Sequence, residues 1–414
     1  MTPVRILILL LACLLSTRAQ AAADPVFSDT GPDAEEYGAA QGYPVPAVAL
    51  GLGRDHMVGF YGHYDRIGRM RTVPTAPPPS PLKRAPEELA LDYEFYGKKT
   101  SLADYLERDP VTGLLIARDD TILFEHYRYG LRDKDRLLSN AMVKTITGLL
   151  VGIAVSEGAI KSIDDNAAAY VPELAGTAYG ATSIRALLHM SSGVQYKEMY
   201  QPGLDNDALG RVLFPSDGQG AIAALRQFAT REAPAGTRWH DSDAETELLG
   251  LVVARATGAS LSDYLSTRIW RKMGMESDAA WEVDAKGQEI AYCCFVATLR
   301  DWARLGLMLA HDGQWNGQQI VPKQWLLDAT SIAKEEPGLG HVTAMGLGYG
   351  YQVWLMPGDR RVFVFAGLRG QRMFIDPTSK LVLVQTAIFS GDDGRALLEI
   401  VALWNTLTSR YGAP

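Results

Sequence analysis

The sequence predicts an α+β fold in which one antiparallel sheet is built from segments near both ends of the chain, with a helical subdomain inserted between them. Runs rich in β-branched and aromatic residues occur at residues 100–138 and again at 345–414. Residues 139–344 show mostly helical spacing of apolar residues. The boundary between the two parts is therefore where we expect a ligand-binding cleft.

The composition is that of an ordinary globular protein with an acidic balance. The chain has 414 residues, a formal net charge of −8 and no run of lysine or arginine. A nucleic-acid or anionic membrane partner is therefore not expected, because both require clustered positive charge. A small molecule bound in a cleft is the expected partner.

The N-terminus has the pattern of a signal peptide over residues 1–21. Arg5 precedes an apolar run at residues 6–15, and the sequence AQA at 19–21 provides small residues for cleavage. The apolar run is too short for a spanning helix, although a retained anchor is the alternative. We therefore expect an exported protein, periplasmic or secreted, that has no membrane association after cleavage.

Residues 22–95 are rich in Pro, Gly and Tyr, and include PTAPPPSP at 74–81. This composition predicts an extended, polyproline-like segment that wraps around a domain formed by residues 96–414.

The remaining cysteines, Cys293 and Cys294, are adjacent in the chain. Adjacent cysteines can bond only through a strained ring, so we expect two buried, small apolar side chains and no disulfide.

The elements of the main domain follow in order. A hairpin is expected at residues 112–130, with its turn at Asp119 and Asp120, followed by a long helix within residues 139–158 that Gly158 ends. Further helices are expected at 182–188, 245–256, 261–273 and 300–310. Strands are expected at 348–356, 361–367, 370–375 and 381–389, and the amphipathic helix 396–407 covers the sheet.

The helix after the hairpin begins with a pair of positions that suits nucleophilic catalysis. Residues three apart share a helix face, so Lys144 can reach a side chain at position 141. A hydroxyl there would be a nucleophile with lysine as its base, provided that neighbours or burial lower the lysine pKa. Position 141 is an alanine, however.

Five motifs give the sequence a resemblance to a known family. They are AMVKT (141–145), LLHMSSG (187–193), WHDSDAETELLG (239–250), ATLRDWARLG (297–306) and GLRGQ (367–371). In this order they resemble the serine β-lactamase-like hydrolases, which include class C β-lactamases, D-Ala-D-Ala carboxypeptidases, esterases and aminohexanoate-oligomer hydrolases. The resemblance covers about residues 95–414 and looks closest to the oligomer-hydrolase and esterase branch. It implies a β-lactamase/transpeptidase-like fold and ester or amide hydrolysis through an acyl-serine, with no cofactor and no metal.

The chain departs from the family pattern at the catalytic positions. Ala141 stands where the family has its serine, Asp241 where it has a tyrosine, and Asp243 where Ser or Asn is usual. Without a hydroxyl at 141 no acyl-serine can form. A carboxylate at 241 would favour the ammonium form of Lys144, so we predict an ion pair between Lys144 and Asp241.

The chain could still bind a ligand without catalysis if the N–H groups that donate to its carbonyl oxygen remain. We expect the backbone N–H of Ala141 to converge with a strand N–H near residues 370–372. The residues expected to bind ligand are Gly370, Gln371, Arg369, Tyr196 and Asp243, with Arg369 available to an anionic group. The ligand would be an ester, an amide or a peptide-like molecule.

Two other interpretations stay open. The chain could be a working hydrolase whose nucleophile is altered in this copy. It could also use different chemistry, in which His240, Asp241 and Asp243 bind a metal or act as acid and base.

Overall fold

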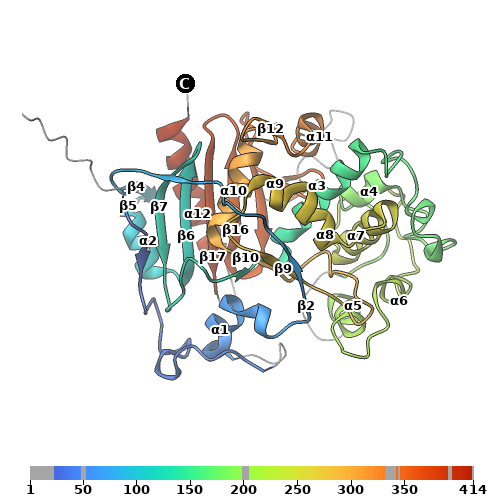
Figure 1. The fold of residues 1–414 in the computed structure, drawn as a ribbon, viewed down its shortest axis with the longest axis horizontal. Coiled ribbons are helices and arrows are strands. Elements are labelled where there is room, and N and C mark those ends of the chain that lie inside the picture. Colours follow the sequence, from blue (N-terminus) through green and yellow to red (C-terminus); the bar gives the residue numbers. More distant parts are fainter. Residues whose placement is uncertain are drawn as a thin grey trace, which may run out of the picture.

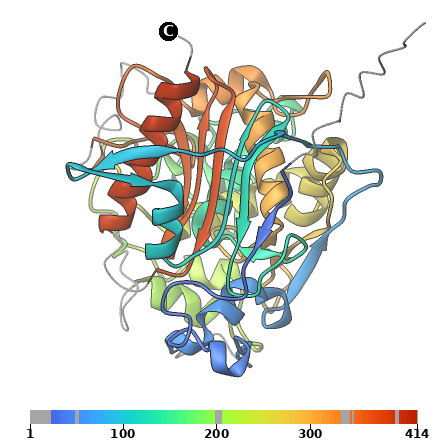
Figure 2. The same ribbon diagram turned by 90° about the vertical axis from the view of Figure 1, so that its left-hand side faces the viewer.

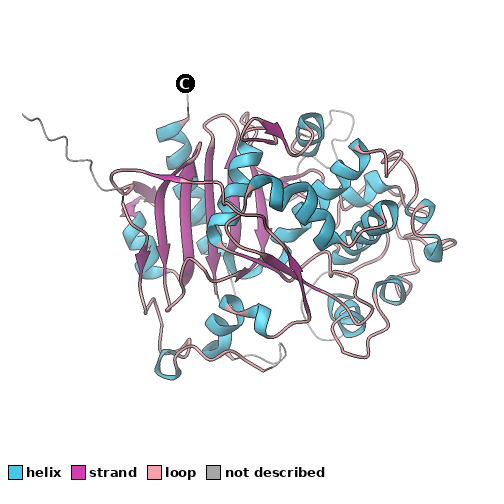
Figure 3. Ribbon diagram, in the orientation of Figure 1, coloured by secondary structure: helices cyan, strands magenta, loops and turns pink. Residues whose placement is uncertain are grey.

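The structure, a computed structural model, describes residues 23–47, 53–197, 205–331, 342–343, 346–389 and 394–412. The expected signal peptide, residues 1–21, lies outside these ranges. The described chain has a sheet part and a helical part side by side (Figure 1, Figure 3). Within the described residues, no helix combines the length and apolar character needed to cross a membrane.

The main sheet is built from both ends of the domain, as the sequence predicts. Its strand order is β1-β7-β6-β17-β16-β15-β14-β13, and β3 also pairs with β7. The bounds are β1 Val26–Phe27, β3 Lys83–Arg84, β6 Val111–Arg118, β7 Thr121–Tyr127, β13 Gly348–Tyr349, β14 Trp354–Leu355, β15 Phe363–Gly367, β16 Gln371–Asp376 and β17 Leu381–Ala387. From β7 to β13 every pairing is antiparallel, whereas β1 and β3 join β7 in parallel.

Each face of the sheet is covered by helices. Helix α2 (Leu102–Arg108) and α12 (Gly394–Tyr411) pack on one face, in front of the sheet in Figure 2, and α10 (Leu299–Ala310) packs on the other. Side chains alternate between the faces, so Phe374 stacks on Trp404 of α12 with a centroid distance of 5.3 Å, while Met373 packs in the opposite core. The expected covering role of the last helix is confirmed.

The helical part carries the remaining long helices. Their bounds are α3 Val143–Ser156, α4 Ile184–Leu188, α5 Asp205–Leu213, α6 Ala221–Leu225, α7 Asp243–Thr257, α8 Leu261–Leu265, α9 Arg271–Met273 and α11 Lys323–Ala329. A π-helical turn at Ser266–Trp270 joins α8 to α9, which makes residues 261–273 one helical run, as expected.

Residues 139–344 are not wholly helical. Strands β9 (Ala279–Glu282) and β10 (Phe295–Ala297) form a second sheet with β2 (Met70–Val73) and β8 (Leu137–Leu138), in the order β2-β9-β10-β8. Two hairpins, β4 (Asp92–Phe95) with β5 (Lys98–Ser101) and β11 (Gln314–Trp315) with β12 (Gln318–Gln319), complete the strands.

The expectation of an extended wrapping segment at 22–95 is wrong for part of that range. Helix α1 (Met57–Gly62) forms there, and β1, β2 and β3 pair with strands of the two sheets. Tyr37, Tyr61 and Tyr64 are buried in the main core. Burial of these aromatic side chains packs the segment onto the domain. The Pro and Gly content of the segment did not predict this packing.

The expectation of two unbonded cysteines is also wrong, because a disulfide joins Cys293 to Cys294. The chain bends tightly there: Cys294 has φ 66° and the N–H of Cys293 donates to the carbonyl of Ile290 at 3.3 Å. The indole N–H of Trp281 holds the bend by donating to the carbonyls of Ile290 and Cys293.

The strand expected at 348–356 is interrupted. β13 and β14 pair with each other across a turn in which the N–H of Gly350 donates to Val353 at 2.8 Å. A Cβ at position 350 would lie 1.8 Å from the carbonyl oxygen of Ala329, so only glycine fits this turn.

Candidate functional site

Position 141 lies in a short 3-10 turn, Asn140–Met142, between β8 and α3. The N–H of Ser139 donates to the carbonyl of Phe295 in β10 at 2.9 Å. Asn140 has φ 46°, a left-handed conformation that Asn tolerates better than most residues. Its side-chain amide donates to the Tyr61 hydroxyl at 3.0 Å and to the carbonyl of Leu368 at 3.1 Å. These contacts fix Ala141 at the start of α3.

The end of β15 lies directly against this turn. A Cβ on Gly367 would stand 2.6 Å from the carbonyl oxygen of Ser139 and 3.1 Å from the backbone nitrogen of Ala141. Glycine is therefore required at 367 for the strand to approach so closely. The convergence of the Ala141 N–H with a strand N–H near residues 370–372 stays a prediction; the strand backbone seen against that nitrogen is at Gly367.

Lys144 forms ion pairs with two carboxylates. Its Nζ lies 3.0 Å from Oδ1 of Asp241 and 2.8 Å from Oδ1 of Asp243. The Lys144 side chain is 7% exposed, and the side chains of Asp241 and Asp243 are 32% and 1% exposed. The predicted ion pair with Asp241 is confirmed. The second pair, with Asp243, was not predicted from the sequence.

Two helices bring these charges together. Lys144 stands in the first turn of α3, and Asp243 is the first residue of α7, which packs against α3. A carboxylate in the first turn of a helix is favoured by the helix dipole. Asp241 precedes α7 and is positioned by the backbone of His240, whose N–H donates to the carbonyl of Met190 at 2.7 Å. Two carboxylates around one amine favour its ammonium form, which has no lone pair to accept a proton.

Two residues further along α7, Glu245 is buried against the LLHMSSG loop. Its Oε1 accepts a hydrogen bond from the Ser192 hydroxyl at 2.6 Å, and its carboxylate also lies near the N–H of Ser192. Burial raises the pKa of Glu245 to about 8, partly offset by these hydrogen bonds. A neutral carboxyl group therefore stands next to the charged cluster near neutral pH.

Several residues expected to bind ligand have structural partners. The Gln371 amide donates to the carbonyl of Ala387 at 2.6 Å and accepts from its N–H at 3.2 Å. The guanidinium of Arg369 donates to the carbonyl of Phe389 at 2.7 Å. A Cβ on Gly370 would lie 2.3 Å from the ring of Phe389. All three residues lie against the end of β17 or the segment that follows it.

Tyr196 and His240 are also engaged away from the charged cluster. Tyr196 is buried, and its ring packs edge-on against Phe228 with a centroid distance of 5.1 Å. The His240 side chain contacts the carbonyl of Tyr196 through Nε2. In the part of the chain that the structure describes, no group of three His, Cys, Asp or Glu residues is arranged to hold a metal ion.

Two features of the site escaped the sequence analysis. Tyr61 comes from the segment interpreted as an extended wrap, so nothing linked it to Asn140. Trp239 packs against Tyr349 and Trp354, with centroid distances of 5.8 and 5.4 Å. Only the abundance of aromatic residues near these positions could have signalled this cluster.

Comparisons with known proteins agree with this fold. Residues 104–397 match the beta-lactamase family. A 6-aminohexanoate-dimer hydrolase of Paenarthrobacter ureafaciens is 29% identical over 301 residues, covering 71% of this chain and 76% of that protein. A Bacillus anthracis structure, provisionally named a 6-aminohexanoate-dimer hydrolase, has a TM-score of 0.76 at 23% identity and covers 86% of this chain and 94% of its own. EstCE1, described as a hydrolase with promiscuous acyltransferase activity, has a TM-score of 0.57 at 16% identity, over 71% and 94% of the two chains. The two structures support the predicted fold.

The first prediction concerns the buried charges. Lys144→Met leaves Asp243 buried without its cation, and we expect a loss of about 3–5 kcal/mol in the free energy of unfolding. Adding Asp243→Leu removes that buried charge and should restore most of the loss. Urea unfolding measures both, with the exposed Lys272→Met as control. A loss below about 1 kcal/mol for Lys144→Met would show that the pair is not coupled to stability.

The second prediction concerns pH. Because the pKa of Glu245 is raised from 4.5 to about 8, its contribution to stability is full below pH 4.5 and is lost as the pH rises through 8. Glu245→Gln should therefore flatten the decline in unfolding free energy between pH 5 and pH 8. Urea unfolding at several pH values tests this, with the exposed Glu94→Gln as the matched control. Parallel pH profiles for Glu245→Gln and the unaltered chain would contradict the assignment.

Proposed function

The chain belongs to the beta-lactamase family, and on that premise we propose that it is an ester- and amide-hydrolase scaffold whose acyl-serine chemistry is disabled. The observation that carries this proposal is the ammonium of Lys144 held by Asp241 and Asp243 beside a methyl group at position 141. A nucleophile and a base are the two parts that acylation requires, and neither is present in this arrangement.

The loss is chemical rather than architectural. Alanine is the best helix former and keeps the backbone N–H of residue 141, so the start of α3 retains its shape. Gly367 still lies against that nitrogen, with its hypothetical Cβ at 3.1 Å. A carbonyl oxygen could be bound there without being attacked, because binding needs donors and not a nucleophile.

The proposed ligand is therefore an ester, an amide or a peptide-like molecule that the chain binds. The name of the Paenarthrobacter ureafaciens relative describes a dimer of 6-aminohexanoate, which makes that dimer the first ligand to test. Trp239 and Trp354, which are partly exposed and pack against the buried Tyr349, supply an aromatic surface that suits the apolar part of such a molecule.

The two other interpretations have weaker support. A working hydrolase altered in this copy would need only residue 141 restored, whereas Asp241 and Asp243 are two further changes around Lys144. Chemistry through His240 would need its imidazole near the carboxylates, but Nε2 contacts the carbonyl of Tyr196.

We also propose that the protein is exported to the periplasm or secreted. Support comes from Arg5 and the apolar run at residues 6–15, followed by AQA at 19–21. A disulfide between Cys293 and Cys294 suits an oxidising compartment.

Expression of the full chain in a bacterial host tests export. The mature protein should be recovered from the periplasm or the medium, with its N-terminus at Ala22 by N-terminal sequencing. A cytoplasmic protein that keeps its first 21 residues would contradict this proposal.

Stepwise restoration tests the disabled chemistry. Labelling by a fluorophosphonate serine reagent and hydrolysis of an activated ester should both be absent in the unaltered chain. Ala141→Ser alone should gain little, because Asp241 and Asp243 still hold Lys144 as an ammonium. Adding Asp241→Tyr and Asp243→Asn should raise the labelling rate by about 100-fold or more, the range that a positioned general base supplies.

Each outcome separates the interpretations. Full activity from Ala141→Ser alone would indicate a working hydrolase altered at one position. Labelling of the unaltered chain would refute the proposal. As a control, Ser139→Ala in the triple variant should leave labelling intact, because Ser139 does not stand three residues before Lys144.

A further inference from the structure

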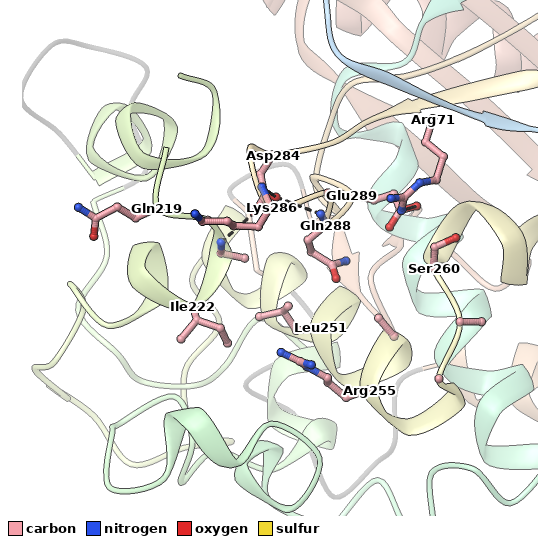
Figure 4. A pocket seen from close by; sticks show the side chains of 16 residues that line it. Arg71, Gln219, Ile222, Leu251, Arg255, Ser260, Asp284, Lys286, Gln288 and Glu289 are labelled. Carbon is pink, nitrogen blue, oxygen red and sulfur yellow. Dashed lines mark hydrogen bonds and ion pairs between the residues drawn. The ribbon is translucent and has the colours of Figure 1, made fainter. Parts of the chain in front are cut away.

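A cavity lies in the helical part, away from Lys144. It has a volume of about 640 Å³ and lies between α6, the C-terminal half of α7 and the loop at residues 284–289 (Figure 4). On α7 its lining includes Leu251 and Arg255. At a rise of 1.5 Å per residue, these stand roughly 12–18 Å along the helix from Asp243. The cavity shares no lining residue with the charged cluster.

The acidic groups in its wall are already used by the fold. Asp284 accepts hydrogen bonds from the backbone N–H groups of Ala221, Lys286 and Gln288, at 3.0, 2.8 and 3.0 Å. It is 2% exposed. This carboxylate closes its own loop onto α6 and has little acceptor capacity to offer a ligand.

Glu289 is used in the same way. Its oxygens accept from the N–H groups of Leu261 and Ser262 at the start of α8, and from the Arg71 guanidinium at 2.8 Å. It is 1% exposed. The negative charges of the wall are therefore neutralised or satisfied within the protein.

The groups left to face the cavity are donors. The exposed ammonium of Lys286 has no hydrogen bond or ion pair to any described residue, and neither does the side-chain nitrogen of Gln288. Figure 4 shows the Gln288 amide pointing from the loop toward Leu251 and Arg255. The Arg255 guanidinium pairs with Glu173 at 2.7 Å but remains 51% exposed. The polar side of the cavity thus favours an anion.

Beside Arg255, the wall of the cavity formed by α6 and α7 is apolar. Ile222 of α6 and Leu251 and Ala254 of α7 form it, together with Ala259. Contact between this surface and a hydrocarbon chain is favourable by about 25 cal/mol for each Å² of apolar surface removed from water.

We propose that this cavity binds a small organic carboxylate with a short aliphatic chain. The carboxylate pairs with Lys286 and Arg255 and accepts a hydrogen bond from the Gln288 amide, while the chain lies on Leu251 and Ile222. The volume falls within the range of small-molecule sites. The inference does not depend on the chemistry at Ala141.

Isothermal titration calorimetry of the folded chain with sodium octanoate tests the site. Octanoate should bind, whereas octylamine of the same chain length should not. Lys286→Glu should weaken octanoate binding by about tenfold or more, because it places a like charge beside the ligand. Lys286 is exposed, so this variant is not expected to disturb the fold.

A second variant tests the apolar side. Ala254→Phe places a ring in the cavity from a partly exposed position of α7 and should reduce binding by a similar factor. Lys134→Glu, an exposed lysine in a loop of the sheet part, is the matched control and should leave affinity unchanged. The absence of octanoate binding, equal binding of octylamine, or unaltered affinity in both cavity variants would each overturn the proposal.

Discussion

The ammonium of Lys144, placed between the carboxylates of Asp241 and Asp243, is the interaction on which the rest of this site depends. Three charges are gathered where α3 meets α7, and two of their side chains are almost fully buried. Burying a charge costs several kcal/mol unless a partner compensates it, so each member of the cluster requires the others. The cluster therefore couples the packing of the two helices to the pairing of these charges.

The contacts that position residue 141 are distinct from the groups that would react there. Asn140, Tyr61 and Gly367 hold the turn around position 141 as tightly as a nucleophile would need. The same turn presents a methyl group, and Lys144 in the helix that follows is ion-paired with two carboxylates. We propose that such a site binds a carbonyl compound rather than cleaving it.

The sequence was informative where local patterns decide the structure. The two β-rich runs in residues 112–130 predicted the β6 and β7 hairpin, and the apolar stripe of 396–407 predicted that α12 covers the sheet. The resemblance placed Asp241 near Lys144, and the ion pair follows from charge alone. The predictions that failed, or were not made, concern contacts between segments that are far apart in the chain. The role of Asp243 depends on where α7 begins, and the approach of Gly367 to Ala141 depends on how β15 lies against a turn more than 200 residues earlier. The contacts of Gln371 with the end of β17 and of Arg369 with the segment after it are of the same kind.

The segment before residue 95 illustrates a different limit. Its Pro and Gly content predicted an extended wrap, yet its tyrosines enter the core and one of them reaches Asn140. Composition averages over a segment, whereas burial is decided by single side chains. Likewise, the disulfide between Cys293 and Cys294 depends on a local bend of the backbone. The adjacency of the two residues in the sequence did not predict that bend.

The charge state of Lys144 is the most direct test of this account. NMR spectroscopy of the lysine side-chain nitrogen, with assignment by Lys144→Met, distinguishes an ammonium from a neutral amine by its chemical shift and attached protons. The account predicts a hydrogen-bonded ammonium at neutral pH that Asp241→Asn together with Asp243→Asn makes easier to deprotonate. A neutral amine in the unaltered chain at that pH would contradict it, because the lysine could then serve as a base.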